Sequence, residues 1–194
     1  MFGVLTDGER HAPVDMRLHL PNRWIEDAAR CDRAGVPERA RAMTSKSEHA
    51  LDIVRRARER GLRFSRVGID AGYGKEPAFL RALDDRNEIF VADVHRDQRV
   101  WTEDLGLHVP DPKSERGRAP RKPQAAKTPV TVETLAKGLS PKDWTRHVLR
   151  DSTRGALQVD IAHVRVWLWD GEEERPRCWH LIVRREVKSP KTIK

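Results

Sequence analysis

One carboxylate, Asp70, occupies a position at which catalytic groups commonly gather. Residues 64–69 (FSRVGI) predict a short buried strand that ends directly before Asp70, and Ala-Gly-Tyr-Gly follows as a tight turn. Ligands bind at the carboxyl ends of strands in α/β units. A carboxylate there suits Mg²⁺ or Mn²⁺, the hard ions that activate water in phosphodiester chemistry. In the alternative interpretation, Asp70 only caps the turn or the helix that follows.

Asp93 is a second candidate, because it lies near His95 in the next predicted strand. It either faces the same end of the sheet as Asp70 or points outward and pairs with an arginine, and we favour the outward position. Six other histidines show no ligand spacing and are expected to be ordinary surface or strand residues: His11, His19, His49, His147, His163 and His180.

Neither cysteine indicates a metal or disulfide site. Cys31 and Cys178 lack CxxC spacing, so we expect thiols that are buried or idle. The tryptophans near basic residues have two interpretations, because such a mixture either stacks on bases or forms the core of a sheet, and we favour the core. These tryptophans are Trp144, Trp167, Trp169 and Trp179.

The elements predicted around Asp70 form a β-α-β unit. Ser45 and Glu48 have the spacing of a capping box, and they predict a helix that ends before Gly61. Beyond Asp70, residues 76–86 predict a second helix and residues 88–94 a second strand. A strand, a helix and a strand at this spacing normally form a parallel pair with a right-handed crossover.

The flanking segments predict a hairpin, a linker and a second sheet. Residues 2–20 read as a hairpin around Gly8, and residues 21–44 as irregular or short helical structure. Residues 110–129 hold five of the twelve prolines and a net charge of +4, which is typical of a basic loop or linker. A short helix is expected over residues 140–151. The last two expected elements are strands within residues 155–171 and 178–187, joined through a turn.

The composition excludes several classes of protein. The 194 residues, 38% hydrophobic and 35% charged, are enough to bury a core and are not disordered throughout. No apolar run approaches the roughly 18 residues of a membrane span, and no secretory signal opens the chain, so we expect a cytoplasmic protein without a membrane partner. The net charge of +8 fits a polyanionic partner, nucleic acid before membrane.

Five ordered segments match a known family: DMRLHLPNRWIEDAARCDRAGVP, TSKSEHALDIV, VGIDAGYG, FVADVHRDQRVW and WHLIVRREVKSPKTIK. Together they resemble the central part of an insertion-sequence transposase of the DDE superfamily, a DDE endonuclease, and the resemblance extends over nearly the whole chain. It implies an α/β fold with part of a ribonuclease H-like nuclease core at residues 1–100. Residues 101–194 would form a β-rich insertion subdomain that contains the basic linker at 110–129.

The resemblance also implies an activity. In this family three acidic residues, Asp, Asp and Glu, hold two divalent metal ions that cut DNA at the transposon end and join it to target DNA. The second of these aspartates matches Asp70, which is thereby implied as a catalytic metal ligand for Mg²⁺ or Mn²⁺. The insertion helps hold the transposon end in relatives, which implies DNA as the partner. The implied phosphate contacts are Arg116, Arg118, Arg121, Lys122, Arg165, Arg175, Arg177, Arg184 and Arg185.

The chain also departs from the family pattern. The family's first aspartate lies upstream of the first residue here, and its glutamate lies beyond the last. Tyr73 is the only tyrosine, so the spaced signature of Tyr, Arg, Glu and Lys around that glutamate is absent. We therefore expect a transposase fragment that binds Mg²⁺ weakly, because a lone carboxylate does not readily displace the hydration shell of the ion. Such a fragment would not cut DNA by itself.

Two other interpretations stay open. In one, the chain is a nonenzymatic DNA-binding remnant that competes with full-length transposase for transposon ends. In the other, it is a remnant without a selected function, which would fold poorly because a missing first strand leaves an unpaired sheet edge.

Overall fold

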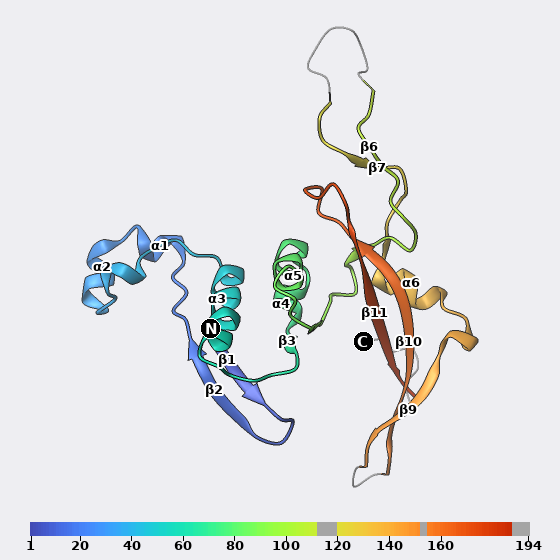
Figure 1. Ribbon diagram of the computed structural model, residues 1–194, viewed down its shortest axis with the longest axis horizontal. Helices are drawn as coiled ribbons and strands as arrows, with labels where there is room; N and C mark the ends of the chain where they lie inside the picture. The colour runs from blue at the N-terminus through green and yellow to red at the C-terminus, as the bar shows by residue number, and fades with distance from the viewer. Residues whose placement is uncertain (112–119, 152–154, 188–194) are drawn as a thin grey trace. The chain divides into compact units, whose positions relative to one another are not determined.

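The computed structural model describes residues 1–111, 120–151 and 155–187. The chain divides into two compact units, Met1–Asp93 and Val94–Lys194 (Figure 1). Helices and small sheets occur in both units, so the predicted mixed α/β class is confirmed, whereas the ribonuclease H-like core stays a prediction. In the described part of the chain, no helix combines the length and the apolar character needed to span a membrane.

Most elements are short, apart from α3, β10 and β11. The first unit contains, in chain order, β1 (Phe2–Thr6), β2 (His11–Met16), α1 (Asn22–Ile25), α2 (Ala28–Arg33), a 3-10 helix (Glu38–Ala40), α3 (Lys46–Glu59), β3 (Val67–Ile69), α4 (Ala71–Gly74), α5 (Pro77–Asp84) and β4 (Phe90–Ala92). The second unit contains β5 (Arg99–Val100), β6 (Leu107–His108), β7 (Gln124–Ala125), β8 (Val130–Thr131), α6 (Val132–Gly138), a 3-10 helix (Pro141–Asp143), β9 (Thr145–Arg150), β10 (Leu157–Leu168) and β11 (Arg177–Glu186).

Strands β1 and β2 form the antiparallel hairpin predicted for residues 2–20 (Figure 1). Gly8 adopts a φ of 99° in the connecting turn, a left-handed conformation that favours glycine. One face of the hairpin packs against α3. Gly3 lies so near this helix that a β-carbon there would come within 2.5 Å of Ile53 Cγ2.

Helix α3 begins with the predicted capping box. The Ser45 hydroxyl accepts a hydrogen bond from the Glu48 N–H at 3.1 Å, and the Glu48 carboxylate accepts one from the Ser45 N–H at 2.7 Å. These bonds satisfy two donors that the first turn of a helix leaves unpaired. The inner face of the helix buries Ile53 and Ala57, and the helix ends before Gly61, as predicted.

The predicted β-α-β unit is confirmed, because β3 and β4 pair in parallel with α4 and α5 between them. Helix α5 starts at Pro77 and buries three apolar side chains: Phe79, Leu80 and Leu83. The first strand differs from the prediction, since only Val67–Ile69 of residues 64–69 is extended in the sheet, and its side chains are half-buried or exposed. Phe64 lies outside the strand, where the Arg58 guanidinium covers its ring at 3.5 Å.

The larger sheet of the second unit has the strand order β11-β10-β9. Its two long strands, β10 and β11, are the strands predicted within residues 155–171 and 178–187, and they pair in antiparallel register. Alternate side chains on one face form the core: Ala162, Val166, Leu168, Leu181 and Val183. From Ile161 onward, more buried and more exposed residues alternate along β10, as in a half-buried antiparallel strand.

The second unit differs from the sequence-based expectations in three places. Residues 140–151 are not a helix, because one 3-10 turn at Pro141–Asp143 gives way to β9, which pairs with β10. Helix α6, capped by the Thr131 hydroxyl, was not predicted. Finally, residues 110–129 are not linker throughout, because β7 pairs with β6. Partner strands supply the ladder hydrogen bonds in two of these cases, and a local sequence pattern does not reveal them.

Candidate functional site

Asp70 lies at the carboxyl end of β3 and is the N-cap residue of α4. Its Oδ1 accepts a hydrogen bond from the Gly72 N–H at 2.8 Å, so the capping interpretation is confirmed. The side chain is exposed, and Oδ2 has no bond of its own within the described residues. Capping therefore leaves one carboxylate oxygen available for a ligand from solution.

Asp93 directly follows β4, beside Asp70 in the parallel register. Ile69 pairs with Ala92, and the Asp93 N–H donates to the Ile69 carbonyl at 2.9 Å. The two aspartates therefore leave neighbouring strands at the same edge of the sheet. The structure shows no ion pair of Asp93 with any described residue, so the expected arginine partner is not seen.

The turn after Asp70 packs closely on this edge. A β-carbon at Gly74 would come 1.9 Å from the Asp93 carbonyl oxygen, so only glycine fits there. Tyr73 packs against Phe79 with ring centroids 5.7 Å apart. Burial raises the pKa of Tyr73, and the negative charge of Asp70 raises it further. The phenol therefore stays neutral, and the carboxylates are the anionic groups at this edge.

The residues at this edge do not form a complete metal site. Within the ranges that the structure describes, no three His, Cys, Asp or Glu side chains gather in a way that could hold a metal ion. Two-metal phosphodiester chemistry needs several carboxylates around both ions, and Mg²⁺ demands near-octahedral oxygen ligation. Asp70 has the right chemistry and the right position, but this donor set is too small for a resident ion.

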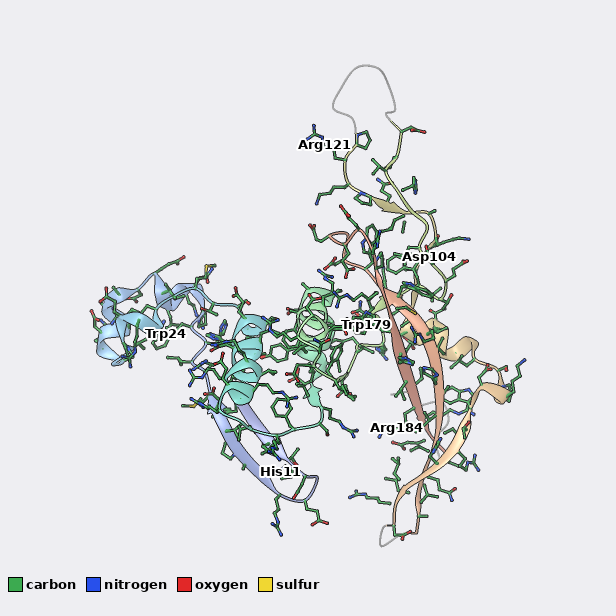
Figure 2. All side chains as sticks on the ribbon, viewed as in Figure 1. His11, Trp24, Asp104, Arg121, Trp179 and Arg184 are labelled. Atoms are coloured by element: carbon green, nitrogen blue, oxygen red, sulfur yellow. The ribbon has the colours of Figure 1, made fainter. Side chains whose placement is uncertain are left out.

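The basic residues proposed to contact DNA differ in their surroundings. Arg184 (Figure 2) is exposed on the β9–β11 sheet. Arg165 is exposed on the same sheet, and no described carboxylate pairs with either arginine. Arg185 is different, because it bonds Asp160 at 3.3 Å and its guanidinium lies 4.1 Å above the Trp144 ring. Its guanidinium is already engaged by the Trp144 ring and by Asp160, which it shares with Arg146, so it is better described as part of the sheet's packing.

The remaining basic candidates lie in residues 110–129 and where the turn after β10 enters β11. Lys122 forms an exposed ion pair with Glu172 at 3.4 Å. Arg121, on the segment that leads into β7, is exposed (Figure 2). Arg175 is exposed and Arg177 half-buried. Arg116 and Arg118 lie outside the described residues.

The four tryptophans expected in the core of a sheet are only half-buried, whereas the two cysteines are free thiols, as expected. Trp169 donates to the Glu173 carbonyl at 2.9 Å and packs edge-on against Trp101. Cys31 is completely buried, and Cys178 is half-buried. Neither thiol forms a disulfide.

Two histidines and an arginine form a cluster that no motif in the sequence indicated. His163 and His180, both expected to be ordinary strand histidines, stack with ring centroids 4.8 Å apart. Their nitrogens Nε2 and Nδ1 lie 2.6 Å apart, and the Arg165 Nη1 lies 2.8 Å from His180 Nε2. Only the pairing register of β10 with β11 brings these residues together, so no spacing along the chain could have revealed them.

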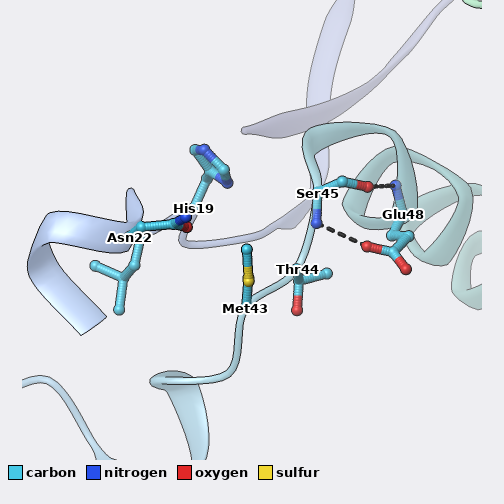
Figure 3. A pocket seen from close by; sticks show the side chains of 7 residues that line it. His19, Asn22, Met43, Thr44, Ser45 and Glu48 are labelled. Atoms are coloured by element: carbon cyan, nitrogen blue, oxygen red, sulfur yellow. Dashed lines mark hydrogen bonds between the residues drawn. The ribbon is translucent and has the colours of Figure 1, made fainter. Parts of the chain in front are cut away.

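A shallow cavity of about 360 Å³ lies at the start of α3, lined by residues that include His19, Asn22 and Met43 (Figure 3). His19 Nδ1 is buried there, without a hydrogen-bond partner among the residues that the structure describes. Burial lowers the pKa of the neighbouring His49, and the charges of His19 and Arg17 lower it further. The Ser45 and Glu48 groups on the cavity wall are already used by the helix cap (Figure 3).

Comparison with known proteins identifies a family. The family model described as "DDE superfamily endonuclease" matches residues 4–156, which include Asp70, both strands of the β-α-β unit and part of the second unit. No curated protein and no solved structure matches the chain.

Proposed function

The chain belongs to the DDE superfamily endonucleases, and from this we propose that it is a DNA-acting part of an insertion-sequence transposase. The observation that carries the proposal is the position of Asp70. It is an exposed carboxylate at the end of a parallel strand, inside the matched residues, with one oxygen not used by the helix cap. Such a position is where an α/β nuclease presents metal ligands to its substrate.

DNA is the proposed partner, because phosphate-directed binding needs basic groups that are not already paired. Arg165 and Arg184 meet this requirement on one face of the β9–β11 sheet. Arg121 meets it on the segment before β7. These contacts would position DNA without reading its sequence. Transposon ends are the proposed target within the cell, and full-length transposase is a proposed further partner.

Asp70 is proposed as one ligand of a divalent metal ion, Mg²⁺ or Mn²⁺, which would supply the charge stabilisation of phosphodiester cleavage when bound. The described donor groups are too few for a complete site. We therefore propose that this chain, taken alone, holds such an ion weakly and does not cut DNA. In this proposal the basic residues of the chain bind the DNA backbone, and Asp70 supplies one carboxylate ligand for the ion.

A nonenzymatic DNA-binding remnant is the second candidate function. The same basic face of the β9–β11 sheet favours it, because that face requires no metal to bind phosphates. The two candidates differ in Asp70, which is a metal ligand in the first and only a helix cap in the second.

A plasmid-nicking assay tests the proposed lack of activity. The purified chain is incubated with supercoiled DNA in Mg²⁺ or Mn²⁺, beside Asp70→Asn and the control Asp97→Asn, whose carboxylate is exposed. We expect no conversion to open circles above the level of Asp70→Asn. Metal-dependent nicking by the wild type and by Asp97→Asn, lost in Asp70→Asn, would show instead that the chain is an active nuclease.

A further inference from the structure

Three side chains form a continuous polar chain across strands β10 and β11. The Arg165 Nη1 lies 2.8 Å from His180 Nε2, and His180 Nδ1 lies 2.6 Å from His163 Nε2. Arg165 also donates from Nε to Cys178 Sγ at 3.3 Å and from Nη2 to the Cys178 carbonyl at 3.4 Å. All three side chains of the chain are exposed.

The hydrogen bonds fix where the protons are. A guanidinium only donates, so His180 Nε2 must accept, and its ring proton then lies on Nδ1. That proton is donated to His163 Nε2, which leaves the His163 proton on Nδ1. Both imidazoles are therefore neutral in this arrangement, and each has one nitrogen that would take up a further proton only if this chain of bonds opened.

Arginines, not carboxylates, lie next to the pair. Arg184 is on the same sheet face, two residues beyond Ile182, the partner of His163. His147 on β9 pairs with Val159, and Arg99 on β5 lies near the other end of β10, so both are farther from the pair along the sheet. The nearest carboxylate on that face of β10 and β11 is Glu186, four residues beyond Ile182, the partner of His163, or roughly 13 Å along the strand. Asp160 projects to the other face and is held by Arg146 and Arg185. An anion bound from outside would supply the negative charge that the described carboxylates do not place next to the pair.

We propose that this face binds the phosphates of DNA together with a proton, which the His163–His180 pair takes up. The proposal rests on the proposed function, because it names the groups that hold DNA and a condition that regulates them. A phosphate between Arg165 and the imidazoles favours their charged form, since an opposite charge within about 4–6 Å raises the pKa of a histidine. By linkage, DNA then binds more tightly as the pH falls.

A cation is a poorer occupant for this cluster. Arg165 sits within hydrogen-bond distance of His180 and would repel a metal ion there. No third His, Cys, Asp or Glu completes a metal-binding group with the pair in the described part of the chain. The chemistry of the site is therefore that of an anion receptor built from one guanidinium and two imidazoles.

The test is the affinity for a DNA duplex of arbitrary sequence, measured by fluorescence anisotropy from pH 5.5 to 8 at constant ionic strength. Uptake of one proton changes the affinity by up to about tenfold per pH unit. We expect the affinity of the wild type to rise severalfold as the pH falls, and His163→Gln and His180→Gln to flatten this rise. His11→Gln, at an exposed histidine of the first unit (Figure 2), should keep it.

Calorimetry tests the same inference on the wild type alone, so it does not require the glutamine variants to fold. The binding heat, measured near pH 6.5 in buffers of different ionisation enthalpy, should show proton uptake on DNA binding. Binding without proton uptake, or an equally steep pH dependence in both glutamine variants, would overturn this inference while leaving DNA binding intact. Absence of DNA binding at every pH and at low salt would instead overturn the proposed function.

Discussion

Asp70 combines two roles at one residue, a helix cap through Oδ1 and a proposed metal ligand through Oδ2. Only the first is visible in the hydrogen bond to Gly72. The second depends on an exposed oxygen, and exposure is compatible with solvent as well as with an ion. The two roles can be separated by an experiment that follows the ion itself.

Mn²⁺ should broaden amide signals of the chain selectively around Asp70. In a ¹⁵N-labelled sample, millimolar Mn²⁺ is expected to broaden the signals of Ala71, Gly72 and Tyr73 first, because relaxation by the ion falls steeply with distance. Asp70→Asn should abolish this effect, while Asp97→Asn keeps it. Broadening that is unchanged in Asp70→Asn would exclude Asp70 as the ligand.

Asp160 contributes to the stability of the fold and not to a proposed binding site. It is buried between two arginines of the β9–β11 sheet. The side-chain hydrogen bond from Arg146 lowers the pKa of Asp160, and the bond from Arg185 lowers it further. A carboxyl group with a lowered native pKa stabilises the fold above its unfolded pKa, and this contribution is lost as the pH falls through the native value.

The free energy of unfolding should therefore decline below about pH 4, the ordinary titration range of an aspartate. Asp160→Asn should be less stable than the wild type at pH 7 and should lose part of that decline. Urea unfolding between pH 2.5 and 7 measures both effects, with Asp97→Asn as the matched control. An identical pH dependence in wild type and Asp160→Asn would contradict this role for the ion pairs.

At the residue scale, the place of a residue within its strand or turn could be predicted from the sequence, whereas the residues that contact its side chain could not. Asp70 was placed correctly because a strand end and a following turn are local features. The contact of His163 with His180 depends on the register of β10 and β11, which joins positions 17 residues apart through a turn whose length is not encoded by a simple motif. Likewise, Arg185 resembled a free phosphate contact until Asp160 was seen beside it.

At the scale of elements, Gly74 shows how closely α4 packs on the sheet edge. Gly74→Ala would place a β-carbon 1.9 Å from the Asp93 carbonyl oxygen, and backbone must move to accommodate it. Overpacking of this kind typically costs about 1–3 kcal/mol. Gly68→Ala is the control, because a β-carbon there meets nothing within 4 Å.

Chemical denaturation of both alanine variants checks this expectation. Gly74→Ala should unfold at clearly lower denaturant concentration, and Gly68→Ala should lie close to the wild type. Equal stabilities of the two variants would mean that the turn after Asp70 does not pack on β4 as described.

Elements with local signals were predictable, and elements that depend on a distant partner were not. Helix α3 carries its capping box and its apolar stripe within one segment, and both were read correctly. Strand β9 was mistaken for a helix, because Ser140 and Asp143 do form a helical capping turn and the strand after it is exposed on all its residues. Its ladder to β10 was the deciding interaction, and it lies outside the segment.

At the scale of the whole molecule, the family and the overall charge point to the same substrate. The family match covers residues 4–156, and the net charge is +8. A positive net charge acts through counterion release when phosphates are neutralised, so the affinity for DNA must depend on salt. The ordered sequence segments were sufficient to indicate the family. Which basic residues are paired with carboxylates and which are not could be seen only in the structure.

The most direct test of DNA binding is the affinity of the chain for a duplex across a series of salt concentrations. We expect the logarithm of the affinity to fall linearly with the logarithm of the salt concentration, in a similar way for unrelated duplexes. Arg184→Ala should reduce the slope by about one, the loss of one phosphate contact, while Arg33→Ala, an exposed arginine of the first unit, leaves it unchanged. An affinity that does not change with salt, or no binding at low salt, would contradict the proposal that this chain binds DNA through phosphate contacts.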